Sequence, residues 1–322
     1  MRFIVLLLTL AVIAPAIAEV KIDQKPDRID VIIDGKPYTT LFMGKDAPKP
    51  YLHPLRSASG KIVTRHYPME NVLGESHDHP HHRGLWFSHG DVNGFDFWAN
   101  ELTGDDRPIR GRIMLNRVEW IKNYPHAGAF QVVFDWLDPK GNKVLTENRT
   151  MTFYDNPGMR VIDTDIVLTA AVKVTFGDTK EGTFAIRLAD ALTEEKGGGL
   201  MTNAQGATTM KNVWGKPSDW VDYVGKIEGE TIGIAIFDHP QNPKHPTTWH
   251  ARDYGLFAAN PFGEHDFYAD PKRNGSLTIP AGGALRFRYR VIIHPGDTKS
   301  AKIDKLYEDY KNLTRNPAQN RP

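Results

Sequence analysis

The side chains most able to do chemistry in this sequence are histidines gathered in one short segment. Five of the 13 histidines lie within residues 77–89, interspersed with acidic and aromatic residues. If this stretch is extended, His77, His79 and His81 point to one face, with about 7 Å between successive Cα atoms. Imidazoles spaced in this way can chelate zinc, copper, iron or nickel. Pro80 cannot donate to a β-ladder, which favours a loop that leads into a strand. The alternative is a polar loop whose histidines bond backbone carbonyls and carboxylates.

A second segment, residues 238–255, has a similar mixture of side chains. It contains three histidines, a tryptophan and an arginine among three prolines, which restrict the loop conformation. Loops held on a rigid scaffold often bind ligands or perform catalysis. We therefore expect the two segments to meet at one site.

The candidate residues in and near these segments have distinct expected roles. The imidazoles of His82 and His250 are predicted to exchange a proton near neutral pH. The guanidinium groups of Arg83 and Arg252 would hold a carboxylate or hydroxyl groups and stabilise developing negative charge. The predicted metal ligands are His79 and His81, which would hold a divalent ion. The predicted substrate-binding residues, among them Trp249 as a ring that stacks on a sugar, are Trp249, His245, Asn260, His89 and Trp98.

Further carboxylates follow the first segment along the chain. A general acid and a general base could be chosen among them, although acidic residues at such positions more often lie in turns or on the exposed surface. They are Asp91, Asp96, Glu101, Asp105 and Asp106.

The rest of the sequence predicts strands that position these segments. Asp34-Gly35 is a hairpin turn between apolar runs at residues 31–33 and 38–43. Turns recur at intervals of roughly ten residues between positions 113 and 168, which is typical of an antiparallel β-sandwich. We expect an all-β fold, a large antiparallel sandwich, with a helix over residues 299–313 that Thr298 caps.

One predicted strand, residues 285–293, places arginines on a single face. Phe287, Tyr289, Val291 and Ile293 alternate with Arg286, Arg288 and Arg290. The arginine face is expected to be solvated, with binding of an acidic or sugar ligand as the alternative.

The ends and the composition of the chain limit its class. A positive start, an apolar run and Ala16-Ile17-Ala18 predict a secretory signal peptide over residues 1–18, and therefore a periplasmic or secreted protein. Residues 19–315 would form a single domain and residues 316–322 a flexible tail. Without Arg2, the chain has 39 basic and 39 acidic residues, a balance that disfavours a nucleic-acid partner. Zero cysteine excludes disulfides, thiolate metal sites and a cysteine nucleophile. No later stretch is long enough to span a membrane.

The histidine segment also resembles a known signature. Residues 78–94, which begin Asp-His-Pro-His-His-Arg-Gly-Leu-Trp, resemble that of a bacterial family labelled PmoA family or DUF6807, whose members are exported β-sandwich proteins. Residues 238–240, 245–257 and 259–263 resemble its second block, and Arg288-Tyr289-Arg290 before His294 its closing strand. The resemblance implies a supersandwich similar to that of galactose mutarotase. His77 falls outside the shared pattern, which favours His79, His81, His82 and His89 as metal ligands.

Three functions are compatible with these features. The preferred one is an exported carbohydrate-active enzyme, a hydrolase, lyase or epimerase, with a small carbohydrate as its ligand. The alternative is a non-catalytic sugar- or metal-binding module. The family label implies a methane monooxygenase subunit, but a membrane-embedded oxidiser needs spanning helices that the sequence lacks. A set such as His79, His81 and Asp91 could in principle hold iron, yet its spacing gives no specific support.

Overall fold

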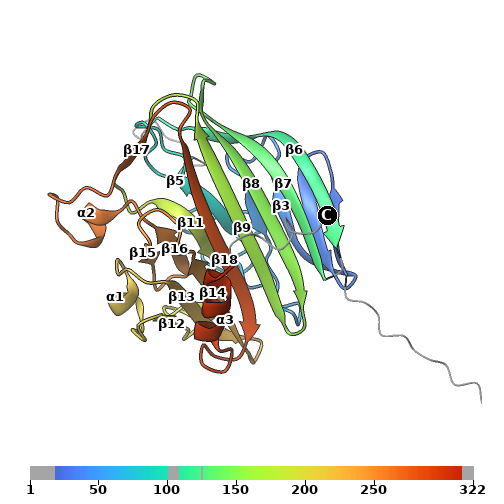
Figure 1. Ribbon diagram of the computed structural model, residues 1–322. Coiled ribbons are helices and arrows are strands. Elements are labelled where there is room, and N and C mark those ends of the chain that lie inside the picture. The colour runs from blue at the N-terminus through green and yellow to red at the C-terminus, as the bar shows by residue number, and fades with distance from the viewer. Residues whose placement is uncertain (1–18, 101–108, 125, 314–322) are drawn as a thin grey trace, which may run out of the picture.

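Two antiparallel eight-stranded sheets form a sandwich (Figure 1), in a computed structural model that describes residues 19–100, 109–124 and 126–313. This confirms the predicted all-β sandwich. The predicted signal peptide at residues 1–18, the tail at 316–322, and Glu101, Asp105 and Asp106 lie outside the described residues.

The first sheet, which we call sheet one, contains the two strands that lie within the histidine-containing segments, β5 and β15. Its strands, in spatial order, are β1 (Val20–Gln24), β2 (Arg28–Ile33), β3 (Lys36–Phe42), β4 (Tyr51–His53), β5 (Leu85–His89), β11 (Gly182–Arg187), β16 (Leu256–Asn260) and β15 (Thr248–Ala251).

The second sheet, sheet two, contains the longest strands, and every neighbouring pair in it is antiparallel. Its strands, in spatial order, are β12 (Leu200–Asn203), β13 (Trp220–Ile227), β14 (Glu230–Asp238), β18 (Ala284–Pro295), β9 (Met159–Ala170), β8 (Lys143–Asn156), β7 (Ala127–Leu137) and β6 (Arg112–Tyr124).

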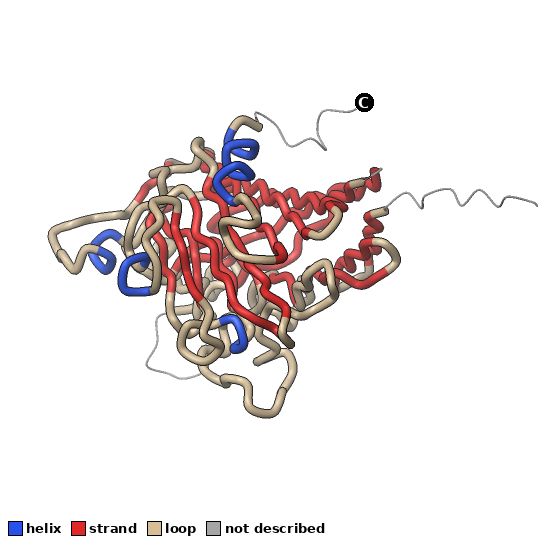
Figure 2. The backbone as a smooth tube through the Cα atoms, turned by 90° about the horizontal axis from the view of Figure 1, so that it is seen from below, coloured by secondary structure: helices blue, strands red, loops and turns tan. Residues whose placement is uncertain are grey.

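The other elements are short, and the helices lie at the periphery of the strands (Figure 2). They are the ribbon of β10 (Val174–Phe176) and β17 (Leu277–Ile279), the 3-10 helix η1 (Asp190–Leu192), and the helices α1 (Met210–Val213), α2 (Glu264–Phe267) and α3 (Ile303–Lys311).

The core between the sheets follows from strand alternation. Phe130, Val132, Phe134 and Trp136 on β7 all point inward and are fully buried. Burial of each such side chain contributes roughly 1.5–3 kcal/mol. The same alternation sends every second residue to an outer face, so each sheet has one apolar face and one face available for polar chemistry.

Helix α3 covers part of the outer face of sheet two. Tyr307 and Tyr310 pack against Phe237 of β14, with ring centroids 5.5 and 5.9 Å apart, and Figure 1 shows α3 beside β14 and β18. The predicted start at residue 299, with Thr298 as its cap, is wrong. Ser300 donates its N–H to the Asp297 carboxylate in a separate turn, and the helix begins after Lys302.

No helix in the described part of the chain is long and apolar enough to cross a membrane.

Candidate functional site

One row of directly paired residues crosses the outer face of sheet one. It runs from Tyr51 on β4 through Trp86, Ala185 and Ala258 to His250 on β15. The row spans four strand spacings, or about 19 Å. Its two central alanines separate the aromatic end from the histidine end. The strand register therefore places His250 on the same face of the sheet as Trp86 of β5, which follows the first histidine turn.

A pocket of about 410 Å³ opens on this side of the molecule. Both segments contribute to it, together with Lys180 and Glu181 from the approach to β11. The residues that line it are His79, His81, His82, Trp98, Ala99, Lys180, Glu181, His250, Arg252 and Tyr254. The two segments thus lie at a single site, as the two-segment hypothesis requires, and each residue's role there stays a prediction.

His79, His81 and His82 of the first segment lie in a turn, and the extended arrangement considered from the histidine spacing does not form. His79 has a positive φ of 44°, and its carbonyl accepts a hydrogen bond from the His82 N–H at 3.0 Å. The rings of Tyr254, His79 and His82 form a continuous stack, with centroids 5.1 and 4.7 Å apart and planes within 10°. His77 points elsewhere and stacks on Tyr67.

Asp78 fixes this turn by joining two buried arginines. Its carboxylate accepts hydrogen bonds from Arg65 and, at 2.7 Å, from Arg187, and both arginine side chains are fully buried. It also accepts the Nδ1 proton of His79 at 2.6 Å. Burial opposes ionisation of Asp78, but the His79 hydrogen bond and the two guanidinium charges outweigh it, so its pKa lies well below the ordinary value.

Burial makes His82 and His250 poor proton carriers near neutral pH, which corrects the predicted role. Desolvation lowers the pKa of His250 to about 3 and that of His82 well below its ordinary value. Arg187 lies 3.4 Å from Nδ1 of His82, and because a guanidinium can only donate, it favours the neutral imidazole. Both rings line the pocket as uncharged groups.

Glu181 and Arg252 bring opposite charges to the pocket. Arg252 was predicted from the sequence, whereas Glu181 was not. Burial raises the pKa of Glu181, which lies 3.4 Å from the Nζ of Lys180. Arg252 lies over the ring of Tyr254, 5.5 Å from its centroid, and burial raises the pKa of Tyr254 to about 12. The pocket thus combines a carboxyl group of raised pKa with two cations, Lys180 and Arg252.

Trp249 and Asn260 have structural roles, and the predicted stacking of Trp249 on a sugar is wrong. Trp249 is adjacent to His250 on β15, so it points to the opposite face. There it is fully buried in the core and donates its indole N–H to the Ser218 carbonyl at 2.8 Å. Asn260 donates to the carbonyls of Thr179 and Lys180, and so holds the turn that presents Lys180 and Glu181.

Three other predicted residues also lie outside the pocket lining. His89 faces the core, where its Nε2 donates to the Gly177 carbonyl at 2.8 Å and burial lowers its pKa to about 4. His245 bonds the Asp238 carboxylate at 2.7 Å within its own loop. Arg83 lies over the ring of Tyr51, 5.5 Å from the centroid.

The predicted metal pair lies at the pocket without a ligand set around it. The ring centroids of His79 and His81 are 5.6 Å apart. Within the described residues, no group of three or more His, Cys, Asp or Glu side chains is arranged to hold a metal ion. His79 already uses Nδ1 to bond Asp78.

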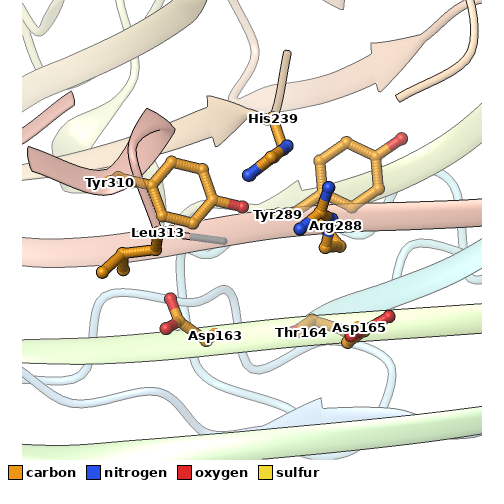
Figure 3. Close-up of a pocket in the computed structure, with 8 residues that line it drawn as sticks. All are labelled: Asp163, Thr164, Asp165, His239, Arg288, Tyr289, Tyr310 and Leu313. Atoms are coloured by element: carbon orange, nitrogen blue, oxygen red, sulfur yellow. The ribbon is translucent and has the colours of Figure 1, made fainter. Parts of the chain in front are cut away.

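The arginine face of β18 forms ion pairs, which neither of its two sequence interpretations foresaw. Arg286 binds Asp165 and Arg290 binds Asp163 through two nitrogens each, and Arg288 donates to the Gln241 side chain. Another, much smaller cavity of about 30 Å³, large enough to admit water, remains among these groups. Figure 3 shows Arg288 and Tyr310 beside His239, with Asp163 and Asp165 on the neighbouring strand.

A family model covers residues 28–308, most of the chain, and its description is a family of unknown function, DUF6807. The chain belongs to the DUF6807 family. Among curated proteins, none matches its sequence.

Solved structures similar to this DUF6807 chain include enzymes that act on galactose or galactosides, at very low identity. One is the GH36 α-galactosidase AgaA from Geobacillus stearothermophilus, with 9% identity and a TM-score of 0.37 over 86% of this chain and 40% of that one. Another is a galactose 1-epimerase from Lactobacillus acidophilus, with 6% identity and a TM-score of 0.37 over 87% and 99% of the two chains. The DUF6807 chain spans about two fifths of the length of the α-galactosidase.

Several pocket residues of this DUF6807 chain had no signal in its sequence. Lys180 and Glu181 line the pocket, and Arg65 and Arg187 hold the Asp78 carboxylate behind it; all four lie outside both histidine-containing segments. Tyr254 lay within the second segment without an assigned role. Its position two residues after Arg252 is the one local hint that the two side chains could meet.

Proposed function

We propose that this pocket binds a small carbohydrate and transfers protons to and from it, so that the chain is a carbohydrate-active enzyme of the hydrolase, lyase or epimerase class. The observation that supports this most is the presence of an aspartate-oriented histidine and a carboxyl group of raised pKa in one pocket. Export remains a prediction, because residues 1–18 lie outside the described part of the chain.

His79 is the proposed base. The ionised Asp78 carboxylate can only accept a hydrogen bond, so the neutral His79 ring keeps its proton on Nδ1 and its lone pair on Nε2. The two arginines hold Asp78 in place, and stacking on Tyr254 and His82 fixes the plane of the ring. An imidazole oriented in this way accepts a proton from a substrate hydroxyl or an activated C–H group.

Glu181 is the proposed acid. Burial raises its pKa, which favours the acid form of its carboxyl group, and in that form the group is suited to donate a proton to a glycosidic or ring oxygen. Lys180 beside it can stabilise the carboxylate that remains after the transfer. Hydrolysis, elimination and epimerisation of sugars all need such a pair of proton-transfer groups.

Turnover by paired variants tests this proposal. The purified protein would be incubated with a panel of glycosides, oligosaccharides and reducing sugars, and products followed by proton NMR. We expect His79→Gln and Glu181→Gln to reduce the rate by about 10²- to 10⁴-fold, the usual contribution of a general acid or base. The matched control is Arg286→Gln, on the outer face of sheet two, which should leave the rate unchanged.

Two results would contradict the proposal. Equal rates for both pocket variants and the wild type would remove the acid–base assignment. Sugar binding without turnover by the wild type would favour the alternative, a non-catalytic sugar-binding module. Melting temperatures of all variants would be measured, so that a folding defect is not mistaken for lost chemistry.

A further inference from the structure

We propose, resting on the proposed function, that the carbohydrate bound in this pocket bears a carboxylate, which Arg252 recognises. The substrate class is therefore an acidic sugar, such as a uronate or an aldonate, rather than a neutral one.

Arg252 lacks the carboxylate partner that Arg286 and Arg290 have. Among the described residues it makes no ion pair, and its Nε is buried without a hydrogen-bond partner. Its guanidinium group lies over the face of Tyr254, 5.5 Å from the ring centroid. Arg286 and Arg290, by contrast, each bind a carboxylate through two nitrogens. A guanidinium that lines a pocket with unused donors is suited to an anion brought by a ligand.

The charges around the pocket favour the same ligand. Behind the His79 turn, two arginines share the single carboxylate of Asp78, which leaves one positive charge in excess. In the pocket itself, Lys180 lies 3.4 Å from Glu181, the one acidic residue among the described residues of the lining. Arg252 adds another cation. The described lining therefore has a net positive charge, which disfavours a cationic ligand and attracts an anionic one.

Geometry favours a carboxylate over a phosphate. The planar fork of a guanidinium matches two oxygens of either a carboxylate or a phosphate, so the choice between them depends on the rest of the lining. Phosphate groups are commonly held at helix N-termini, whereas each of the ten lining residues lies in a strand, turn or loop. The pocket volume of about 410 Å³ is in the range of small-molecule sites.

Binding of matched sugars tests the inference. D-glucuronate and D-galacturonate would be compared with D-glucose and D-galactose by isothermal titration calorimetry, with glucose 6-phosphate as a third arm. We expect the two uronates to bind at least tenfold more tightly than the neutral sugars. Arg252→Gln should weaken uronate binding roughly ten- to hundredfold and weaken the binding of neutral sugars by a smaller factor, so that the preference for uronates is lost. Arg252→Lys should retain part of the preference, since it keeps the charge and loses the fork.

The controls separate this inference from the proposed function. Arg286→Gln, a paired arginine on the other sheet, should bind uronates as the wild type does, and melting curves would establish that the Arg252 variants fold. Equal binding of acidic and neutral sugars, no binding of either uronate, or binding of the phosphate sugar alone would overturn the inference. Turnover of a neutral sugar that depends on His79 would overturn it too, while leaving the proposed function in place.

Discussion

The outer faces of the two sheets both carry arginines, aspartates and histidines, but they use them differently. On sheet two, Arg290 binds Asp163, Arg286 binds Asp165, and His294 lies 3.0 Å from Asp222. Helix α3 packs over part of this face and leaves a cavity of about 30 Å³. On sheet one, Arg252 has no such partner in the described residues, and a pocket of about 410 Å³ stays open.

This difference changes the pKa of histidines on the two faces in opposite directions, as His294 and His250 show. Burial disfavours the charged ring in both places. At His294 the hydrogen bond and the charge of Asp222 outweigh burial, and the pKa is raised. At His250 no described carboxylate offsets burial, and the pKa falls to about 3. Paired groups stabilise a fold, whereas groups left unpaired beside a cavity are available to a ligand.

Removing the carboxylate of Asp78 should have the largest effect on this contrast. Asp78→Asn leaves Arg65 and Arg187 buried without their shared anion. We expect a loss of roughly 2–3 kcal/mol in the free energy of unfolding, below that of a fully buried pair because 38% of the Asp78 side chain is exposed. Turnover should fall at least tenfold, because His79 loses the group that orients it. Chemical denaturation and the carbohydrate assay measure the two effects.

The matched change on sheet two is Asp163→Asn, which breaks the pair with Arg290. It should cost about 1–2 kcal/mol of stability and leave turnover unchanged. If both variants lost turnover in proportion to their stability, the distinction between a structural and a functional face would be wrong.

Replacing each of two tryptophans, Trp249 and Trp98, by phenylalanine should sharpen the same comparison. Trp249→Phe removes core volume and the hydrogen bond to Ser218, so we expect a loss of about 2 kcal/mol in the free energy of unfolding and no change in sugar affinity. Trp98→Phe alters a ring that lines the pocket and should change sugar affinity at least as much as stability. Reduced sugar affinity in Trp249→Phe alone would contradict this placement.

These tryptophans also show how far the sequence alone could go. The sandwich followed from turn spacing and period-two patterns, which are local and depend little on packing. The same alternation implies that His250 and Trp249 point to opposite faces, so the two could not both have faced a ligand. His89 likewise shares a face with Phe87, a core residue.

Other parts of the site depended on contacts that no local pattern encodes. Asp78 meets Arg187 across 109 residues of sequence, and this pair forms only once β5 and β11 are in register. The turn at His79 follows from that anchoring, which explains why an extended histidine pair did not form. Glu181 had no distinguishing neighbours in sequence, since its raised pKa arises from burial in the folded chain.

The last comparison concerns the dependence of stability on pH, which has opposite signs on the two faces. Since the pKa of His250 is lower in the folded than in the unfolded chain, the unfolded chain binds the extra proton as pH falls below 6.5, and stability is lost between about pH 6.5 and 3. His250→Gln should reduce this loss by up to about 1.4 kcal/mol per pH unit. Since the pKa of His294 is raised, its contribution is fully present below 6.5 and is lost as pH rises through the folded value.

His294→Gln therefore tests the alkaline side. The wild type should lose stability as pH rises above 6.5. The variant should be less stable than the wild type below pH 6.5, and its stability should depend little on pH above 6.5. Denaturation midpoints at a series of pH values, measured for both glutamine variants, separate the two effects. The effect of His294 should be the smaller one, because burial of its ring opposes the gain from Asp222, whereas at His250 no described carboxylate opposes burial. An alkaline loss that persisted in His294→Gln would show that the His294–Asp222 pair is not its source.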